Sequence, residues 1–167
     1  MKALRLALVL CMAAAAALQA GAKKTPAVSI RYYGEAGSEG GNFSDKVTLQ
    51  SGKQTYMSSM PLVTEREIKT FYPFPAKDGS MGAYFWLDAH GSRTFEQHTM
   101  ANRGSYVLVF FNGRHVVDLY VDKAVHSGRV VIPGGLTQSD IELLDMTFPR
   151  YGHEGEKPAG KLKKPAA

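Results

Sequence analysis

The sequence predicts a single α+β domain, in which two to three short helices pack on one face of a largely antiparallel sheet. Three observations indicate this fold class. Asn112-Gly113 joins two apolar runs, and this dipeptide is typical of a hairpin because a type I′ turn requires positive φ at both central residues. Another apolar run, 83–88, ends at Asp88, which can cap a following helix. No internal repeat is visible, so we expect residues 23–150 to form one domain.

The first 22 residues are typical of a secretory signal peptide. Lys2 and Arg5 precede the uncharged apolar run 6–18, and small residues follow it. This run is shorter than the roughly 20 residues of a membrane-spanning helix. We therefore expect cleavage near Ala22, export to the periplasm or cell envelope, and no transmembrane segment in the mature chain. An uncleaved anchor is the alternative.

The only cysteine, Cys11, lies inside the predicted signal peptide. A lipoprotein signal needs a small residue before its cysteine, whereas here the residue is Leu10. After cleavage the mature chain would have no disulfide, no thiolate metal ligand and no cysteine nucleophile. The predicted domain must then be stabilised by its hydrophobic core alone.

Charge is distributed unevenly along the chain. Residues 23–149 contain 13 Lys+Arg and 13 Asp+Glu, whereas residues 150–167 contain five basic and two acidic residues, 5 − 2 = +3. The basic character therefore comes from the two ends, and a neutral domain argues against a nucleic-acid partner. Residues 151–167 are predicted to be a disordered basic tail, because Lys, Pro, Gly and Ala cannot bury enough surface to order it. Attraction to anionic lipid or wall polymer is the alternative role for this tail.

The first half of the domain is predicted to contain strands and one helix. Residues 27–36 alternate as a strand, and 47–49 with 55–57 predict a second hairpin. Thr64 to Glu67 forms a capping-box pattern, so we expect a short helix that buries Ile68, Phe71 and Tyr72 and ends at Pro73.

The second half is predicted to be strand, helix, three strands and helix. Residues 83–88 are apolar on both faces, which predicts a central strand. Asp88 can cap a helix over 89–102 with a thin buried face. Thr137 and Asp140 form another capping box before the last helix. The residues expected to be buried on these two helices are Gly91, Phe95, Thr99, Ile141, Leu144 and Phe148.

The Asn112-Gly113 turn also predicts which hairpin residues share a face. We expect the two strands to pair without interruption, from Phe111 opposite Arg114 to Tyr106 opposite Leu119. This register places four residues on one face, which we assign to the core: Leu108, Phe110, His115 and Val117. The opposite face is too apolar to remain bare. Either residues 27–60 cover it, or it binds extended polypeptide or a protein partner. The candidate partner-binding residues are Val107, Val109, Phe111, Val116 and Tyr120.

A set of glycines, turns and apolar positions is shared with a known family, and the residues that carry it are Leu87-Asp88, Gly91, Phe95, Thr99, Asn102, Gly104, 106–111, Asn112-Gly113-Arg114, Val125, Gly134-Gly135 and Leu136-Thr137. Through them residues 83–148 resemble the head subdomain of the first periplasmic region of SecD, part of the SecDF protein-export complex. The head of that family is thought to touch unfolded polypeptide. Unlike SecD, this chain has no apolar segment after residue 22 that predicts a transmembrane helix. The resemblance therefore implies a free-standing exported domain that binds polypeptide.

The remaining motifs do not indicate an enzyme, a cofactor or a metal site. His90 and His98 are eight residues apart, about two helical turns, which is too far to share a metal ion without a third ligand between them. Gly134-Gly135 lacks the lysine and the spacing of a phosphate-binding loop. We therefore expect a noncatalytic envelope domain that binds polypeptide or a protein partner. The alternatives are an enzyme of unknown reaction that uses His98, Asp118 or His126, and a structural accessory without a ligand.

Overall fold

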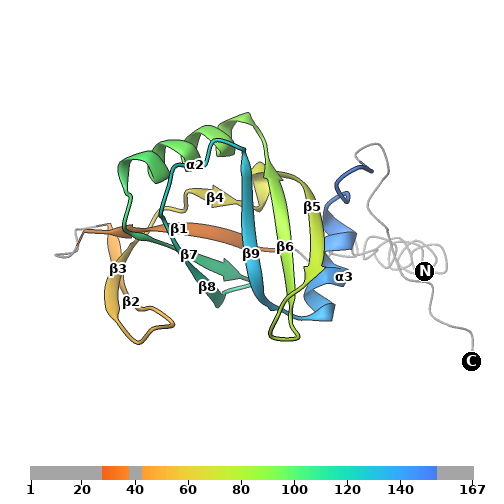
Figure 1. Cartoon of the computed structure of the whole chain (residues 1–167), viewed down its shortest axis with the longest axis horizontal. Helices are drawn as coiled ribbons and strands as arrows, with labels where there is room; N and C mark the ends of the chain where they lie inside the picture. Colours follow the sequence, from red (N-terminus) through yellow and green to blue (C-terminus); the bar gives the residue numbers. More distant parts are fainter. Residues whose placement is uncertain (1–27, 38–42, 154–167) are drawn as a thin grey trace, which may run out of the picture.

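The structure is a computed structural model that describes residues 28–37 and 43–153 (Figure 1). The predicted signal peptide, 1–22, and all but the first three residues of the predicted tail, 151–167, lie outside the described residues. Within the described part, no helix has the length and hydropathy needed to cross a membrane.

The chain forms two antiparallel sheets and two α-helices, which confirms the predicted α+β class. The larger sheet has the order β2-β3-β1-β7-β8, with β4 paired to β1 as well. Its strands are β1 (Ile30–Ala36), β2 (Ser44–Thr48), β3 (Gln54–Ser58), β4 (Val63–Thr64), β7 (Tyr106–Phe111) and β8 (Arg114–Tyr120). The smaller sheet has the order β5-β6-β9, with β5 (Ile68–Pro75), β6 (Met81–Leu87) and β9 (Arg129–Leu136). The predicted single sheet is therefore divided in two, and β6 is central in its sheet as expected.

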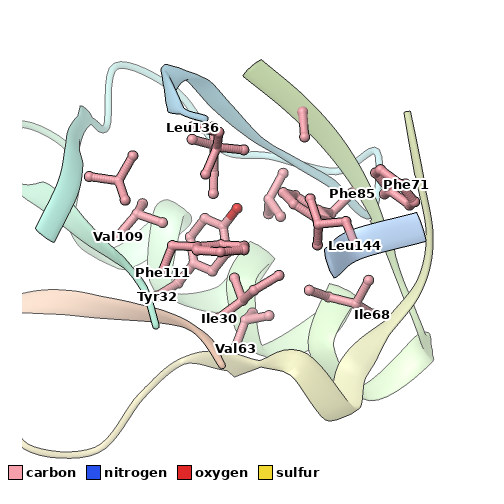
Figure 2. Packing of buried hydrophobic residues seen from close by; sticks show 14 of the residues in the cluster. Ile30, Tyr32, Val63, Ile68, Phe71, Phe85, Val109, Phe111, Leu136 and Leu144 are labelled. Atoms are coloured by element: carbon pink, nitrogen blue, oxygen red, sulfur yellow. The ribbon is translucent and has the colours of Figure 1, made fainter. Parts of the chain in front are cut away.

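The hydrophobic core lies between the two sheets (Figure 2). Tyr32 and Phe111 come from the larger sheet, whereas Phe71 and Phe85 come from the smaller one, and all four side chains are fully buried. Burying an aromatic or large aliphatic side chain contributes about 1.5–3 kcal/mol relative to leaving it exposed. Burial of these side chains in one core cluster therefore stabilises the packing of the two sheets.

Helix α2 (Ala89–Ala101) forms as the sequence predicts. The Asp88 carboxylate caps it by accepting a hydrogen bond of 2.7 Å from the Gly91 amide. Gly91, Phe95 and Thr99 are the buried residues of this helix. The Phe95 ring packs edge-on against Tyr32, with 6.1 Å between ring centroids, so α2 closes one side of the core.

Helix α3 (Gln138–Thr147) also confirms its predicted cap and buried face. Thr137 Oγ1 accepts from the Asp140 amide, and the Asp140 carboxylate accepts from the Thr137 amide. Ile141, Leu144 and Phe148 join the core cluster. This helix begins at the cap because two of the backbone amides left without intrahelical partners at its start, those of Thr137 and Asp140, are satisfied there.

The predicted helix over residues 64–72 is wrong beyond its first turn. The capping box between Thr64 and Glu67 is present, but it starts only the 3-10 turn η2 (Glu65–Glu67). Ile68 then becomes extended, and strand β5 runs to Pro75. Pairing with β6 places Phe71 opposite Phe85 in the core, and the β-branched and aromatic residues of this segment favour a strand.

The predicted hairpin turn is confirmed, with positive φ at Asn112 (48°) and Gly113 (78°). The predicted register is confirmed for Phe111–Arg114 and Phe110–His115, and it is wrong further on, because Val109 pairs with Val117. Val116 is thus an extra residue on β8, and such a bulge shifts each later pair by one position.

The predicted assignment of the hairpin faces is wrong as well. The core side carries Val107, Val109, Phe111 and Val116, whereas Phe110 and His115 lie on the other face and are only half-buried. Along β7 both faces are apolar, so the alternation of the sequence does not distinguish them.

The other face of the hairpin is partly covered by the loop between β2 and β3. The side-chain amide of Gln50 donates to the Val116 carbonyl at 2.6 Å, and the Gln50 backbone amide donates to Asp118 at 2.6 Å. Leu49 and Leu108 are buried yet are not part of the main core cluster. Residues 44–58 therefore cover part of the face that the sequence predicts to be interior.

Candidate functional site: an apolar slot between the two sheet edges

The structure places most of the predicted partner-binding residues in the core. Val107, Val109 and Phe111 have no exposed surface, and Val116 is 8% exposed. These four side chains are buried because the two faces of the hairpin are reversed relative to the prediction. Tyr120, by contrast, is 58% exposed at the end of β8.

Tyr120 lies at an apolar slot beneath α2, where the two sheets come together without pairing. Strand β8 is at one edge of the larger sheet and β9 is at one edge of the smaller sheet. The apolar part of the lining comes from α2, β7, the end of β8 and β9, and consists of Phe95, Val107, Leu119, Tyr120, Val121, Val125, Val130 and Val131. The polar residues of the lining are Thr99, Asp122, Lys123 and Arg129. Two of the five predicted residues, Val107 and Tyr120, thus belong to one site.

The slot has a volume of about 170 Å³. Pockets for drug-sized ligands measure about 300–1,000 Å³, whereas a cavity of about 150 Å³ lined by aliphatic side chains stays dry and accepts benzene. The slot is therefore the size of one apolar side chain and too small for a whole cofactor.

The loop from Asp122 to Gly128 forms one wall of the slot and is fastened to α2. The Val125 amide donates to Thr99 Oγ1 at 3.0 Å, and His126 Nδ1 lies 2.6 Å from Glu96 Oε1. Thr99 is only 2% exposed, and its own hydroxyl donates to the Phe95 carbonyl. These contacts hold the wall in place, so the slot is already formed without a ligand.

The candidate catalytic residues are not brought together. His98 lies against β1, and burial lowers its pKa. Asp118 pairs with His115 at 2.6 Å on the face covered by the β2–β3 loop, whereas His126 pairs with Glu96 on α2. In residues 28–37 and 43–153, no group of His, Cys, Asp and Glu side chains could hold a metal ion. His98 Nδ1 lies 3.2 Å from Asn102 Nδ2, so each of the three residues contacts a different neighbour.

An aromatic layer on the smaller sheet was not predicted from the sequence. Trp86 stacks on Tyr151 with 4.0 Å between centroids, and the Arg129 guanidinium lies 4.9 Å from the centre of the Tyr84 ring. Phe74 lies 4.8 Å from Tyr84. The only sequence signal is the alternation of aromatic residues along β5 and β6. Because these rings contact one another, the layer shields the sheet.

Comparison with known proteins identifies a related fold. No family model matches the chain, and no curated protein matches its sequence. The structure is similar to one reported under "Structure and function of a membrane component SecDF that enhances protein export", with a TM-score of 0.52 and 15% identity over 84% of this chain and 69% of that one.

A second similar structure is "Crystal structure of SecDF in Super-membrane-facing form". The TM-score is 0.50 and the identity 14%, over 70% of this chain and 18% of that chain. The predicted resemblance to SecDF is therefore confirmed at the level of the fold. At such low identity the similarity concerns architecture and says nothing about activity.

Proposed function

We propose that this protein is a noncatalytic domain of the bacterial envelope that binds an extended segment of polypeptide, one apolar side chain of which enters the slot. The observation that carries the proposal is a preformed apolar slot of about 170 Å³ at the meeting point of two sheet edges. A polypeptide can add to a sheet edge through main-chain hydrogen bonds while a pocket selects a side chain. The SecDF-like fold supports this proposal through the reported link of SecDF to protein export.

The slot is shaped for selection by size. Val107, Val121 and Val130, which line the slot, are apolar and are each no more than 5% exposed. Burying a leucine or phenylalanine side chain there contributes about 1.5–3 kcal/mol, and alanine contributes much less. Binding through one such contact is weak and tolerant of sequence, as a domain that meets many polypeptides requires.

Fluorescence anisotropy with short labelled peptides tests the proposal. One peptide carries a single central leucine in a Gly/Ser/Thr background, and the matched peptide carries alanine at that position. We expect the leucine peptide to bind at least about tenfold more tightly, from the transfer free energy of the larger side chain. Val125→Trp, which places a large ring in the loop wall of the slot, should abolish this difference.

Two exposed tyrosines provide a matched pair of variants. Tyr120→Ala removes a ring at the slot and should weaken binding of the leucine peptide, whereas Tyr72→Ala removes a ring of 52% exposure from β5 and should leave it unchanged. Equal binding of the two peptides, or unchanged binding to Val125→Trp, would exclude the slot as the binding site.

A further inference from the structure

A second and larger hollow adjoins the slot. It lies between the end of β1, the β2–β3 ribbon and the turn that leads from α2 to β7, and its volume is about 660 Å³. Figure 1 shows the end of α2 above β3 at this end of the molecule. The lining is predominantly polar and includes Glu35, Lys46, Lys53, Asn102, Arg103 and Ser105. Its size lies within the range of ligand pockets, about 300–1,000 Å³.

The hollow has an excess of positive charge. Lys46, Lys53 and Arg103 are exposed, and none of them forms an ion pair among the described residues. Glu35 is the only carboxylate among the described residues of the lining, and both of its oxygens are occupied. One accepts from the Thr55 hydroxyl at 2.5 Å and the other from the Tyr106 amide at 2.9 Å.

The described residues of the lining therefore carry a formal charge of 3 − 1 = +2. Residues 23–149 as a whole are neutral, so this excess is local. Three unpaired cations around a hollow attract a negatively charged group, because opposite charges within a few ångströms stabilise each other. The net charge of residues 23–149 does not indicate this cluster of cations. The cluster forms because folding brings β2, β3 and the α2–β7 turn together.

A pair of backbone hydrogen bonds connects the hollow to the slot. The Gly104 amide donates to the Val121 carbonyl at 2.8 Å, and the Val121 amide donates to the Ser105 carbonyl at 2.9 Å. Gly104 and Ser105 line the hollow, whereas Val121 lines the slot. An extended chain advances about 3.3 Å per residue, so residues a few positions apart can reach both sites.

From this geometry we infer that the polypeptide bound by the slot is acidic next to its apolar anchor, with a carboxylate placed in the hollow between Lys46, Lys53 and Arg103. This inference depends on the proposed function, because the slot holds the anchor. The hollow adds a preference for charge to a site that otherwise selects only by size.

Two peptides that share the leucine anchor test this inference. One carries glutamates a few residues from the leucine and the other carries glutamines at the same positions. We expect the glutamate peptide to bind about two- to tenfold more tightly at low salt, the range expected for one or two exposed ion pairs. The preference should disappear as sodium chloride approaches about 1 M, where charges are screened beyond about 3 Å.

Charge-reversal variants test whether the preference for the glutamate peptide comes from the cations of the hollow. Lys46→Glu combined with Arg103→Glu should reverse the preference, while the affinity for the glutamine peptide stays the same. The control, Lys69→Glu combined with Lys77→Glu, changes the net charge equally at two exposed lysines outside the hollow and should retain the preference.

The outcomes separate this inference from the proposed function. Equal binding of the two peptides to the unmodified protein, or a preference that survives in the Lys46/Arg103 variant, overturns the inference and leaves the slot intact. Failure of both peptides to bind overturns the proposed function, and the inference with it.

Discussion

The contact between His98 and Gly34 offers a sharp test of how α2 packs on the larger sheet. A Cβ added to Gly34 would lie 2.3 Å from His98 Cε1 and 2.8 Å from Nε2, far inside ordinary van der Waals contact. Gly34 has no positive φ, so its backbone accommodates alanine, and the three atoms nearest to the added Cβ all belong to the imidazole ring. Gly34→Ala should therefore force the ring away from β1.

The size of the effect follows from two opposing contributions. Replacing glycine by alanine in a compatible conformation stabilises a protein by about 0.4–1 kcal/mol, because the unfolded chain loses freedom. Overpacking costs about 1–3 kcal/mol. Since the obstructing atoms are at the end of a side chain that can move, we expect the lower part of that range, and a net loss of about 0.5–1 kcal/mol in the free energy of unfolding.

The displaced ring should also report its position through its protonation. Burial lowers the pKa of His98, and Nε2 is buried without a hydrogen-bond partner in the described part of the chain. In Gly34→Ala the ring should move toward water, so its pKa should rise toward the ordinary value of 6.5. Titration of the imidazole signals by NMR measures this change directly.

The same pKa predicts how stability depends on pH. Because the pKa is lower in the folded state, the unfolded chain binds the proton first, and the free energy of unfolding falls as the pH drops below about 6.5. Above that pH both states are neutral at His98 and the effect is absent. His98→Gln removes this contribution, so between about pH 7 and 5 it should lose less stability than the unmodified protein.

A double-mutant cycle of Gly34→Ala and His98→Ala, measured by chemical denaturation, tests whether the His98 ring causes the loss of stability. In a His98→Ala background the obstacle is gone, and Gly34→Ala should be neutral or slightly stabilising. Gly37→Ala is the control, because nothing lies within 4 Å of the added Cβ. An equal cost of Gly34→Ala in both backgrounds, or an unchanged pKa of His98, would refute the proposed contact.

Three further predictions concern other elements. Thr137→Ala should lower the free energy of unfolding by about 1 kcal/mol, because it removes the cap of α3, while Ser139→Ala, at an exposed position of the same turn, should have little effect in denaturation experiments. Leu144→Ala should cost about 2–5 kcal/mol, since this side chain is fully buried, and the neighbouring Leu143→Ala should cost clearly less; equal losses would contradict the assigned face of α3. Tyr151→Ala should shift the emission of Trp86, the only tryptophan, to longer wavelength by exposing the indole, whereas Tyr72→Ala should not; an unchanged spectrum would argue against the stacked pair.

The features that were predicted correctly depend on residues close together in the chain. Asn112-Gly113 forms the expected turn because its conformation is set by two adjacent residues. Asp88 and Thr137 cap their helices through bonds to amides three residues away. The buried face of α2 follows from helical periodicity, which a single segment already contains.

The predictions that were wrong concern segments whose conformation depends on contacts with residues far away in the sequence. Residues 68–72 carry a helix signal, but pairing of Phe71 with Phe85 makes them a strand. The bulge at Val116 places this side chain against Gly135 of β9, where the ideal Cβ of the glycine would lie 3.0 Å from Val116 Cγ1. Such a contact between strands far apart in sequence has no local signal.

The candidate site also combines features with a local signal and features without one. Val107 and Tyr120 were predicted as part of one apolar hairpin face, and both line the slot, but whether they bind a partner stays a prediction. The wall contributed by α2 and the loop before β9, and the three cations of the adjoining hollow, come from segments that only folding brings together.

The amino-acid sequence by itself determined the α+β class, the hairpin turn and both helix caps, because each depends on backbone geometry and hydrogen bonds within a few residues. Only the tertiary structure decided which face of β7 is buried, that there are two sheets, and where the slot lies. The physical reason is that β7 is apolar on both sides, so its own sequence does not determine which face enters the core. The elements that cover each face determine it: the smaller sheet covers one face and the β2–β3 loop covers part of the other.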